Sequence, residues 1–300
     1  MGHRMDSEKR LKIAIQKSGR LADMSLQLLE KCGIQLSKSR DQLLCRSQNF
    51  PLDVFLVRDD DIPAFLATDV CQLGVLGQNV LREKQAVGNG KFAGLVEELP
   101  LGYGRCRLSI AVPQGFAYDG LASLQGKTIA TSYKGLLGAY LTANNISADI
   151  VTMEGAVEVA PRTHLADVIC DLVSTGNTLI SNGLVETDVI LQSEAVLVKN
   201  QIADAEIAQL CDKLMSRIKA VQRAAQSRYI MLNSPTDSLA AIKAVLPGSQ
   251  SPTVMPLQGR DDMVAVHAVC EEGVFWDTME ELKANGANSI LVVPIEKMLD

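Results

Sequence analysis

Aromatic residues are scarce in this 300-residue sequence, and long apolar runs are absent. Aromatic side chains make up 4% of the chain, which argues against stacking platforms for single-stranded nucleic acid. No stretch of about 18 apolar residues occurs, so no membrane-spanning helix is predicted. The net charge of −6 also argues against nucleic acid or an anionic membrane as a general partner. With 47% hydrophobic and 21% charged residues, the composition is that of a globular protein with a large core.

Paired metal-ligand spacings are also missing. The seven cysteines include no Cys-x-x-Cys pair, and the three histidines are widely separated in the sequence. This pattern does not predict a zinc site, and it is typical of reduced, buried thiols in a cytoplasmic protein. The charged residues 1–10 contain no apolar stretch, so no signal peptide is expected. Met5 is a candidate native start, which would make residues 1–4 an addition.

Short apolar runs alternate with amphipathic stretches over the first two thirds of the chain. The runs predicted as strands cover residues 11–15, 53–57, 73–76, 108–112, 128–130, 150–153, 168–173 and 189–198. Segments with helical spacing follow several of them, as at residues 21–32, 136–144 and 203–227. Strands that alternate with helices predict an α/β protein with mostly parallel sheets.

The last quarter of the chain has a different pattern. Strands are predicted at residues 229–232, 253–257, 263–269 and 289–293, with helices at residues 237–245 and 275–285. The resulting order, βαββαβ, is that of a ferredoxin-like unit. Such a unit is compact and suited to packing sheet against sheet between subunits.

The most informative segment is the predicted strand at residues 168–173 and the polar loop after it. One acid, Asp171, interrupts the apolar strand, where an unpaired carboxylate is costly. The loop consists of Ser174, Thr175, Gly176, Asn177 and Thr178. Its N–H groups and hydroxyls favour an anion, and an acid beside a phosphate cradle favours a sugar phosphate. The alternatives are an ordinary turn with Thr178 as the N-cap, and an internal salt bridge for Asp171.

Other polar residues follow predicted strands, at the edge where ligands bind in open α/β sheets. Candidates for phosphate or nucleotide contact are Lys17, Ser18, Gly19, Arg20, Arg58, Ser132 and Tyr133. Asp60 and Asp61 are expected to lie in a solvated turn. Glu158 and Arg162 have one-turn spacing on a helix predicted at residues 158–166, and either contact the ligand or pair with each other. Asp167 has either a site role or a structural role at the end of that helix.

Several separated segments together resemble the long form of the ATP phosphoribosyltransferase family. They are Ile15–Leu21, Val57–Pro63, Leu73–Gly77, Glu158–Leu179 and the C-terminal Ile290–Lys297. The resemblance covers nearly the whole chain from about Leu11, and the segment Glu158–Leu179 is its specific part. One departure is His164, where the family commonly has glycine. A histidine there either narrows the ribose pocket or faces solvent.

The resemblance implies a fold and a domain organisation. Two lobes like those of periplasmic binding proteins are expected, with the site between them and an ACT-like, ferredoxin-like regulatory domain at the C-terminus. Residues 1–104 and 184–224 would form the first lobe, residues 105–183 the second, and residues 225–300 the regulatory domain.

The resemblance also implies the reaction and its participants. N1 of the adenine of ATP attacks C1 of 5-phosphoribosyl 1-pyrophosphate (PRPP), and pyrophosphate leaves, as the first step of histidine biosynthesis. Mg²⁺ carried by the substrates, feedback inhibition by histidine and a homo-oligomer between dimer and hexamer are expected, and AMP is a further candidate effector.

Residue roles follow from the matched motifs. Asp171, Asp167 and Arg20 are the expected catalytic residues. The PRPP site is expected to comprise Glu158, Arg162, Ser174, Thr175, Gly176, Asn177 and Thr178. ATP or phosphate contacts are expected from Lys17, Ser18, Gly19, Arg58, Ser132 and Tyr133. The histidine effector is expected at Asn233, Ser234, Ser251 and Thr253.

Two rival interpretations remain open. A type I phosphoribosyltransferase also ends a strand with acids and a polar loop, but it usually has two adjacent acids, whereas leucine follows Asp171 here. A binding protein of the periplasmic-receptor type should carry a secretion signal, and the sensor half of a transcription regulator should begin with a helix-turn-helix. The first predicted strand here begins at Leu11 without either.

Overall fold

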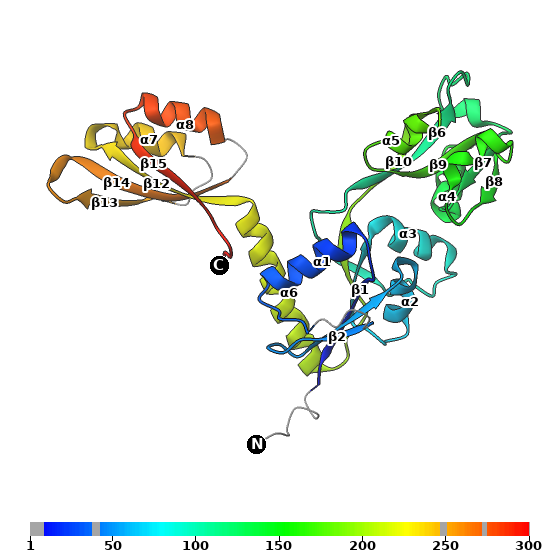
Figure 1. Ribbon diagram of the computed structural model, residues 1–300, viewed down its shortest axis with the longest axis horizontal. Coiled ribbons are helices and arrows are strands. Elements are labelled where there is room, and N and C mark those ends of the chain that lie inside the picture. The colour runs from blue at the N-terminus through cyan, green and yellow to red at the C-terminus, as the bar shows by residue number, and fades with distance from the viewer. Residues whose placement is uncertain (1–8, 38–42, 247–250, 272–274, 300) are drawn as a thin grey trace. The chain divides into compact units, whose positions relative to one another are not determined.

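The computed structural model describes residues 9–37, 43–246, 251–271 and 275–299, which form two compact units (Figure 1). The first unit runs to Glu30 and from Ile34 to Cys211, and the second comprises Lys31–Gly33 and the chain from Asp212. Helix α6 (Ala205–Ala225) contributes to both. Each unit is described separately below.

Lobe 1, in the first unit, contains a six-stranded sheet in the order β2-β3-β1-β4-β11-β5. Its strands are β1 (Leu11–Gln16), β2 (Leu44–Arg46), β3 (Leu52–Val57), β4 (Leu73–Gly77), β5 (Val96–Pro100) and β11 (Ala195–Lys199). Strands β3, β1 and β4 are parallel. Strand β2 pairs antiparallel with β3, and β11 pairs antiparallel with both β4 and β5. Its helices are α1 (Arg20–Lys31), α2 (Ile62–Ala67) and α3 (Gln78–Val87). The short strands β2 and β5 were not predicted from the sequence.

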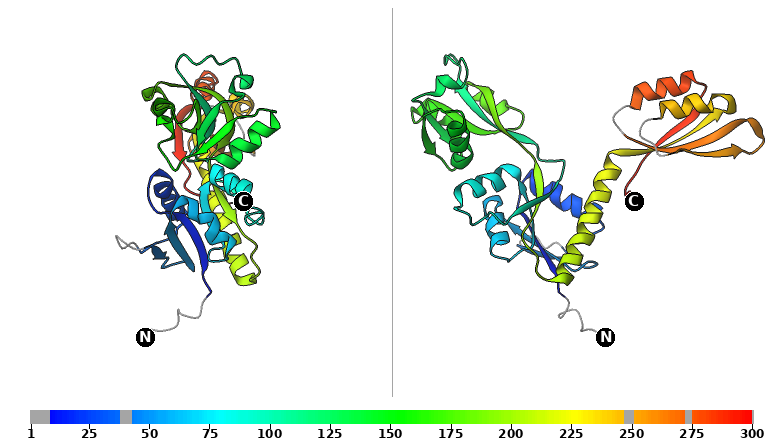
Figure 2. Two further views of the ribbon diagram at one scale, coloured as in Figure 1. Left: turned by 90° about the vertical axis from the view of Figure 1, so that its right-hand side faces the viewer. Right: turned by 180° about the vertical axis from the view of Figure 1, so that it is seen from behind.

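Lobe 2, also in the first unit, contains a five-stranded sheet in the order β10-β6-β9-β7-β8. Its elements are β6 (Cys106–Pro113), β7 (Thr128–Thr131), α4 (Lys134–Ala143), β8 (Asp149–Thr152), β9 (Val168–Val173), α5 (Asn177–Ser181) and β10 (Leu184–Ser193). Strands β9, β7 and β8 are parallel, and β6 pairs antiparallel with both β9 and β10. Figure 2 shows this lobe from two further directions.

The sequence predicted that the chain returns to the first lobe at residue 184, and this prediction is wrong. The apolar run at residues 189–198 consists of two strands that are separated at Glu194. The first of them, β10, pairs with β6 and belongs to lobe 2, and only β11 joins the first sheet. The expected limit at residue 224 also differs, because α6 from Asp212 onward groups with the C-terminal unit. There the carbonyl of Ala220 accepts the N–H of Met298 at 3.2 Å.

The second unit contains a four-stranded sheet in the order β13-β14-β12-β15. Its elements are β12 (Ser227–Pro235), α7 (Leu239–Val245), β13 (Thr253–Leu257), β14 (Arg260–Glu271), α8 (Phe275–Ala284) and β15 (Asn288–Pro294). This connectivity confirms the ferredoxin-like prediction. Helices α7 and α8 lie on one face of the sheet, where Ile242 and Leu282 pack with Ile230 and Leu232 (Figure 1).

The helix predicted at residues 158–166 is absent. Two 3₁₀ turns, Val157–Val159 and Pro161–Thr163, occupy this stretch, and His164 ends the second in a left-handed conformation (φ 58°). His164 is exposed, so it faces solvent. A positive φ also explains why glycine suits this position in the family, since glycine adopts it without a steric penalty.

Arg10, just before β1, forms a buried ion pair in lobe 1. Its Nε donates to Asp53 Oδ1 at 2.7 Å, and its Nη2 donates to the carbonyls of Ser47 and Leu52. The Asp53 side chain is only 8% exposed, so its charge depends on this partner. The pair fixes the start of β1 against the start of β3.

Asp59, in the turn after β3, is a buried acid of a different kind. Its Oδ1 is inaccessible to water and has no hydrogen-bond partner in the described part of the chain. Burial raises the pKa of Asp59 to about 6, and the charge of Asp60 adds to the rise, while Lys84 opposes it. Only the carboxyls of Asp60 and Asp61 are exposed, as expected for a solvated turn.

We expect Arg10→Ala to lower the free energy of unfolding by about 3 kcal/mol, because Asp53 would be left charged and buried. Denaturant titration of the purified protein measures this change. Arg46→Ala is the control, since Arg46 lies 3.8 Å from the same Asp53 oxygen with a side chain that is 62% exposed. Arg46→Ala should lower the free energy of unfolding by less than about 1 kcal/mol. Equal losses of stability in the two variants would contradict the assignment of Arg10 as the partner of Asp53.

Asp59→Asn should stabilise the protein increasingly as pH rises. The folded state keeps the Asp59 proton up to about pH 6, whereas the unfolded chain releases it near 3.8. The favourable contribution of Asp59 to the free energy of unfolding is therefore fully present below pH 3.8 and is lost as pH rises through 6. The free energy of unfolding falls by about 3 kcal/mol over this range because of Asp59. The difference in melting temperature between variant and wild type should grow by several degrees between pH 4 and pH 7. Asp61→Asn should show no such trend.

Candidate functional site

The polar loop after β9 is open to a ligand. Gly176 is the N-cap of α5 in a left-handed conformation (φ 82°), so Thr178 is not the N-cap. Within the described chain, no protein acceptor receives the N–H groups of Thr175, Gly176 and Asn177. Ser174, Thr175 and Thr178 are exposed, and their hydroxyls make no hydrogen bond with a described residue. The loop therefore presents several donors to solvent.

Asp171 lies two residues before the end of β9 and is partly buried. Its Oδ1 accepts the N–H of Leu172 at 2.8 Å, and it forms no ion pair with any residue that the structure describes, which disfavours the salt-bridge alternative. Burial raises the pKa of Asp171, the hydrogen bond from Leu172 opposes the rise, and the charge of Glu158 adds to it. The structure therefore brings Glu158 close to Asp171. Arg162 is exposed on the second 3₁₀ turn.

The hydrogen bonds of Asp167 favour the structural alternative to its expected catalytic role. Its Oδ2 accepts the N–H of Thr128 at 2.8 Å, and its own N–H donates to the Thr128 carbonyl. Both residues lie where β7 and β9 begin, while the polar loop follows the end of β9. Six strand residues separate the two ends, which places Asp167 roughly 20 Å from the loop. Asp167 ties two parallel strands together at their amino ends.

Lobe 1 contributes cations at the carboxyl edge of its sheet. Lys17, Ser18, Gly19 and Arg20 follow β1, and Arg58 follows the adjacent parallel strand β3. All five residues are exposed. Gly19 has a φ of 93°, and this left-handed conformation turns the chain directly before α1. Lys17, Arg20 and Arg58 form no ion pair within the described ranges. They are therefore open to an anionic ligand.

Ser132 and Tyr133 follow β7, but the N-terminus of α4 beside them is already occupied. Glu83 of α3 accepts the N–H groups of Gly135 and Leu136, both at 2.8 Å. Ser132 Oγ donates to the Met153 carbonyl, and Tyr133 Oη accepts from Asn79 Nδ2 at 2.9 Å. The expected phosphate contact at this helix start is therefore not supported by the geometry.

Tyr133 also shows which groups lie near one another. Burial raises the pKa of its phenol, and the charges of Asp171 and Asp59 raise it further. Asp59 follows a strand of lobe 1, whereas Asp171 belongs to lobe 2. Sequence reasoning missed Asp59 and Glu83, because their surroundings come from elements distant in the chain.

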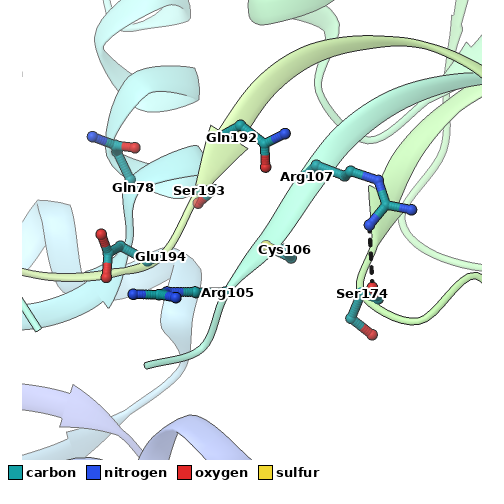
Figure 3. A pocket seen from close by; sticks show the side chains of 8 residues that line it. All are labelled: Gln78, Arg105, Cys106, Arg107, Ser174, Gln192, Ser193 and Glu194. Atoms are coloured by element: carbon teal, nitrogen blue, oxygen red, sulfur yellow. Dashed lines mark hydrogen bonds between the residues drawn. The ribbon is translucent and has the colours of Figure 1, made fainter. Parts of the chain in front are cut away.

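A pocket of about 420 Å³ adjoins the polar loop. Its lining comprises Gln78, Arg105, Cys106, Arg107, Ser174, Gln192, Ser193 and Glu194. Figure 3 shows the hydrogen bond from Arg107 to the Ser174 carbonyl, which measures 3.2 Å. Arg107 also binds Glu186, and Ser109 Oγ donates to the same carboxylate at 2.7 Å. Arg105 and Arg107 were not predicted, although two arginines between two expected strands were a visible signal.

The expected effector residues of the C-terminal unit fall on different surfaces. Ser234 is fully buried, and its Oγ donates to the Pro235 carbonyl, so this geometry does not support the expected contact with histidine. The alternation of strand β12 places Asn233 on the opposite, open face. Ser251 and Thr253 are exposed, and Thr253 pairs with His267 in the sheet.

The described part of the chain shows neither a protein-held metal cluster nor a membrane span. In the described ranges, no group of three or more His, Cys, Asp or Glu side chains could hold a metal ion. None of the helices within these ranges is long and apolar enough to cross a membrane.

Comparison with known proteins gives consistent matches along the chain. A sequence model described as ATP phosphoribosyltransferase matches residues 58–220, and one described as HisG, C-terminal domain, matches residues 224–297. The ATP phosphoribosyltransferase of Maricaulis maris (strain MCS10) is 48% identical over 97% of this chain and 99% of its own length.

Solved structures extend the comparison. The ATP phosphoribosyl transferase (HisG:HisZ) complex from Thermotoga maritima matches with a TM-score of 0.57 and 27% identity, over 70% of this chain and 98% of that chain. A periplasmic binding protein from Brucella ovis with glutathione bound matches at 11% identity and a TM-score of 0.41, over 72% of this chain and 68% of that one. The family model that matches residues 58–220 and the relative that is 48% identical over 97% of the chain show the same family, and the chain belongs to the ATP phosphoribosyltransferase family.

Proposed function

We propose that the polar loop and Asp171 hold PRPP in the reaction of this ATP phosphoribosyltransferase. The enzyme transfers the phosphoribosyl group of PRPP to N1 of the adenine of ATP and releases pyrophosphate, the first step of histidine biosynthesis. The observation that carries the proposal is the loop at residues 174–178. Among the described residues, its N–H groups at 175–177 and its hydroxyls have no protein partner, and the neighbouring Asp171 carboxylate has no cation. The 5-phosphate would occupy the loop, and Asp171 would accept from the ribose hydroxyls.

The chemistry explains why no catalytic base is needed to create the nucleophile. Adenine N1 already has a lone pair, so the barrier lies in aligning two polyanions and in stabilising a sugar that becomes cationic as pyrophosphate departs. Alignment and electrostatics therefore dominate. The carboxylates of Asp171 and Glu158 would stabilise positive charge on the sugar, and Lys17, Arg20 and Arg58 would offset the charge of the phosphates.

We propose that Mg²⁺ arrives with the substrates. Pyrophosphate and triphosphate groups bind Mg²⁺ readily, and substrate phosphates commonly complete its coordination. The described residues form no cluster that could hold the ion alone. The protein would then supply at most one or two carboxylates, for which Asp171 and Glu158 are the candidates.

We propose a homo-oligomer that assembles through the open face of the C-terminal sheet. Tyr229 and Met231 alternate with the buried Ile230 and therefore lie on the face opposite α7 and α8. Leu291 and Val293 of β15 pair with them and are 56% and 41% exposed. An exposed apolar sheet face of this kind is typical of a subunit interface. A symmetric assembly of up to six chains is consistent with it.

We propose that histidine inhibits the enzyme through this C-terminal unit and that Asn233 contributes to its site. Asn233 and Thr253 both offer polar groups at the open face, next to the apolar residues of the interface. An effector bound there would favour the oligomer whose interface it bridges. AMP remains a candidate second effector. We place the enzyme in the cytoplasm, where ATP is abundant and where buried thiols, six of the seven cysteines here, stay reduced.

Asp171→Asn should lower kcat/KM for PRPP by about 10- to 100-fold, because a charge-assisted hydrogen bond to the sugar is lost. The near-ultraviolet absorbance of N1-substituted adenine follows the reaction in a mixture of enzyme, ATP, PRPP and Mg²⁺. Asp167→Asn is the matched control and should retain near wild-type activity. Equal activity in both variants would remove Asp171 from the site, and folded wild-type protein that produces no absorbance change would refute the reaction.

Asn233→Ala should raise the histidine concentration for half-inhibition about tenfold, as expected for loss of one or two hydrogen bonds. The control is Ser234→Ala, since that side chain lies under the helices. Inhibition curves at saturating substrates measure both. If Ser234→Ala changed sensitivity as much as Asn233→Ala, the open face would not be the effector site.

A further inference from the structure

Helices α3 and α4 form a contact between the two lobes of the first unit, and one acidic side chain is central to it. Glu83 lies on α3 of lobe 1 and is 9% exposed. Its two carboxylate oxygens accept the N–H groups of Gly135 and Leu136, the second and third residues of α4 in lobe 2. The N-cap residue, Tyr133, makes no side-chain cap. The first turn of α4 is therefore capped by the other lobe, where a negative charge is stabilised by the helix dipole.

The backbone at Gly135 is shaped for this contact. A Cβ atom at Gly135 would lie 2.7 Å from Val87 Cγ1 and 2.8 Å from Ala86 Cβ, and 3.2 Å from the Glu83 carboxylate. Such distances leave no room for any side chain, although the φ of Gly135 is not in the left-handed region. Glycine at this position therefore serves the close approach of the two helices.

A second polar link runs beside the first. Asn79 Nδ2 donates to Tyr133 Oη, and Asn79 Oδ1 accepts from Ser193 Oγ at 2.9 Å. The N–H of Asn79 also donates to Ser193 Oγ at 3.0 Å. Ser193 ends β10, directly before the chain crosses to β11 of lobe 1. The link joins α3, the start of α4 and this crossing. Asn79 and Ser193 are buried with these bonds made, and Tyr133 is partly buried.

We propose that Glu83 is a positioning residue that fixes the two lobes in the arrangement required to align ATP with PRPP. The inference rests on the placement of PRPP on lobe 2 proposed above, with the cations of lobe 1 facing the nucleotide phosphates. Misplacement of one substrate by about 1 Å can cost about 100-fold in rate, so the contact that sets the lobe arrangement controls catalysis. Glu83 acts through this geometry and does not contact the reacting atoms.

The position of Glu83 also gives the helix start a different role from the one its sequence suggests. The N-terminus of α4 would otherwise attract a phosphate. Because a carboxylate of the protein already occupies it, a second anion there would meet like charge. The α4 dipole therefore contributes to lobe docking, and the phosphates are left to the polar loop and to the cations of lobe 1.

The test compares Glu83→Gln with Glu97→Gln. The glutamine at position 83 keeps one acceptor but turns an amide NH₂ toward an N–H donor. Glu97 is the matched control, because its carboxylate accepts from Gln78 and Arg82, both within lobe 1. For Glu83→Gln we expect kcat to fall at least tenfold, while the Kd for PRPP alone, measured by calorimetry, stays within twofold of wild type. Glu97→Gln should leave both quantities within twofold.

Gly135→Ala gives an independent check, since it separates the helices without changing a charge. It should reproduce the loss of kcat with unchanged PRPP affinity, and it decides the question if Glu83→Gln does not fold. An unchanged kcat in the folded variant, or a PRPP affinity that falls in parallel with kcat, would overturn the proposal. A wrong assignment of the PRPP site would be recognised separately. In that case Asp171→Asn would leave kcat/KM for PRPP unchanged, whatever the result for Glu83→Gln.

Discussion

The ends of parallel strands are the constraint on which the candidate site depends. In lobe 1, β1, β3 and β4 run in the same direction, and polar turns follow β1 and β3 at one edge of the sheet. In lobe 2, β7 and β9 do the same, and the polar loop follows β9. Backbone N–H groups and side chains that are distant in sequence therefore meet at these edges. The antiparallel strands at the flanks complete the sheets and carry the chain between the lobes.

The two lobes present different kinds of group at the carboxyl ends of their parallel strands. Lobe 1 presents exposed cations without carboxylate partners among the described residues, while lobe 2 presents neutral N–H groups, hydroxyls and the acid Asp171. Glu83, at the contact between the lobes, has both carboxylate oxygens bonded to N–H groups of α4. The helix dipole offsets its negative charge there.

The sequence predicted the architecture well where local pattern decides it. Strand and helix alternation, the βαββαβ tail and the polar loop all depend on neighbouring residues, and the structure contains them. The errors arose where tertiary pairing decides. A continuous apolar run hid the break at Glu194, and a helix-like spacing hid the turns that end at His164. Asp167 resembled a site acid until its bond with Thr128 was visible, and the partner of Glu83 lies 52 residues away in the chain.

The order of the strands has a consequence for how the protein is made. Lobe 2 is inserted between β5 and β11 of lobe 1, and β11 lies between β4 and β5 in the finished sheet. The residues of β11 from Ala195 to Val198 are completely buried, so the sheet of lobe 1 lacks an interior strand until they have been synthesised. A nascent chain can thus complete the lobe 2 sheet first, and the earlier-made lobe must wait, with an unpaired strand edge that invites association with other chains.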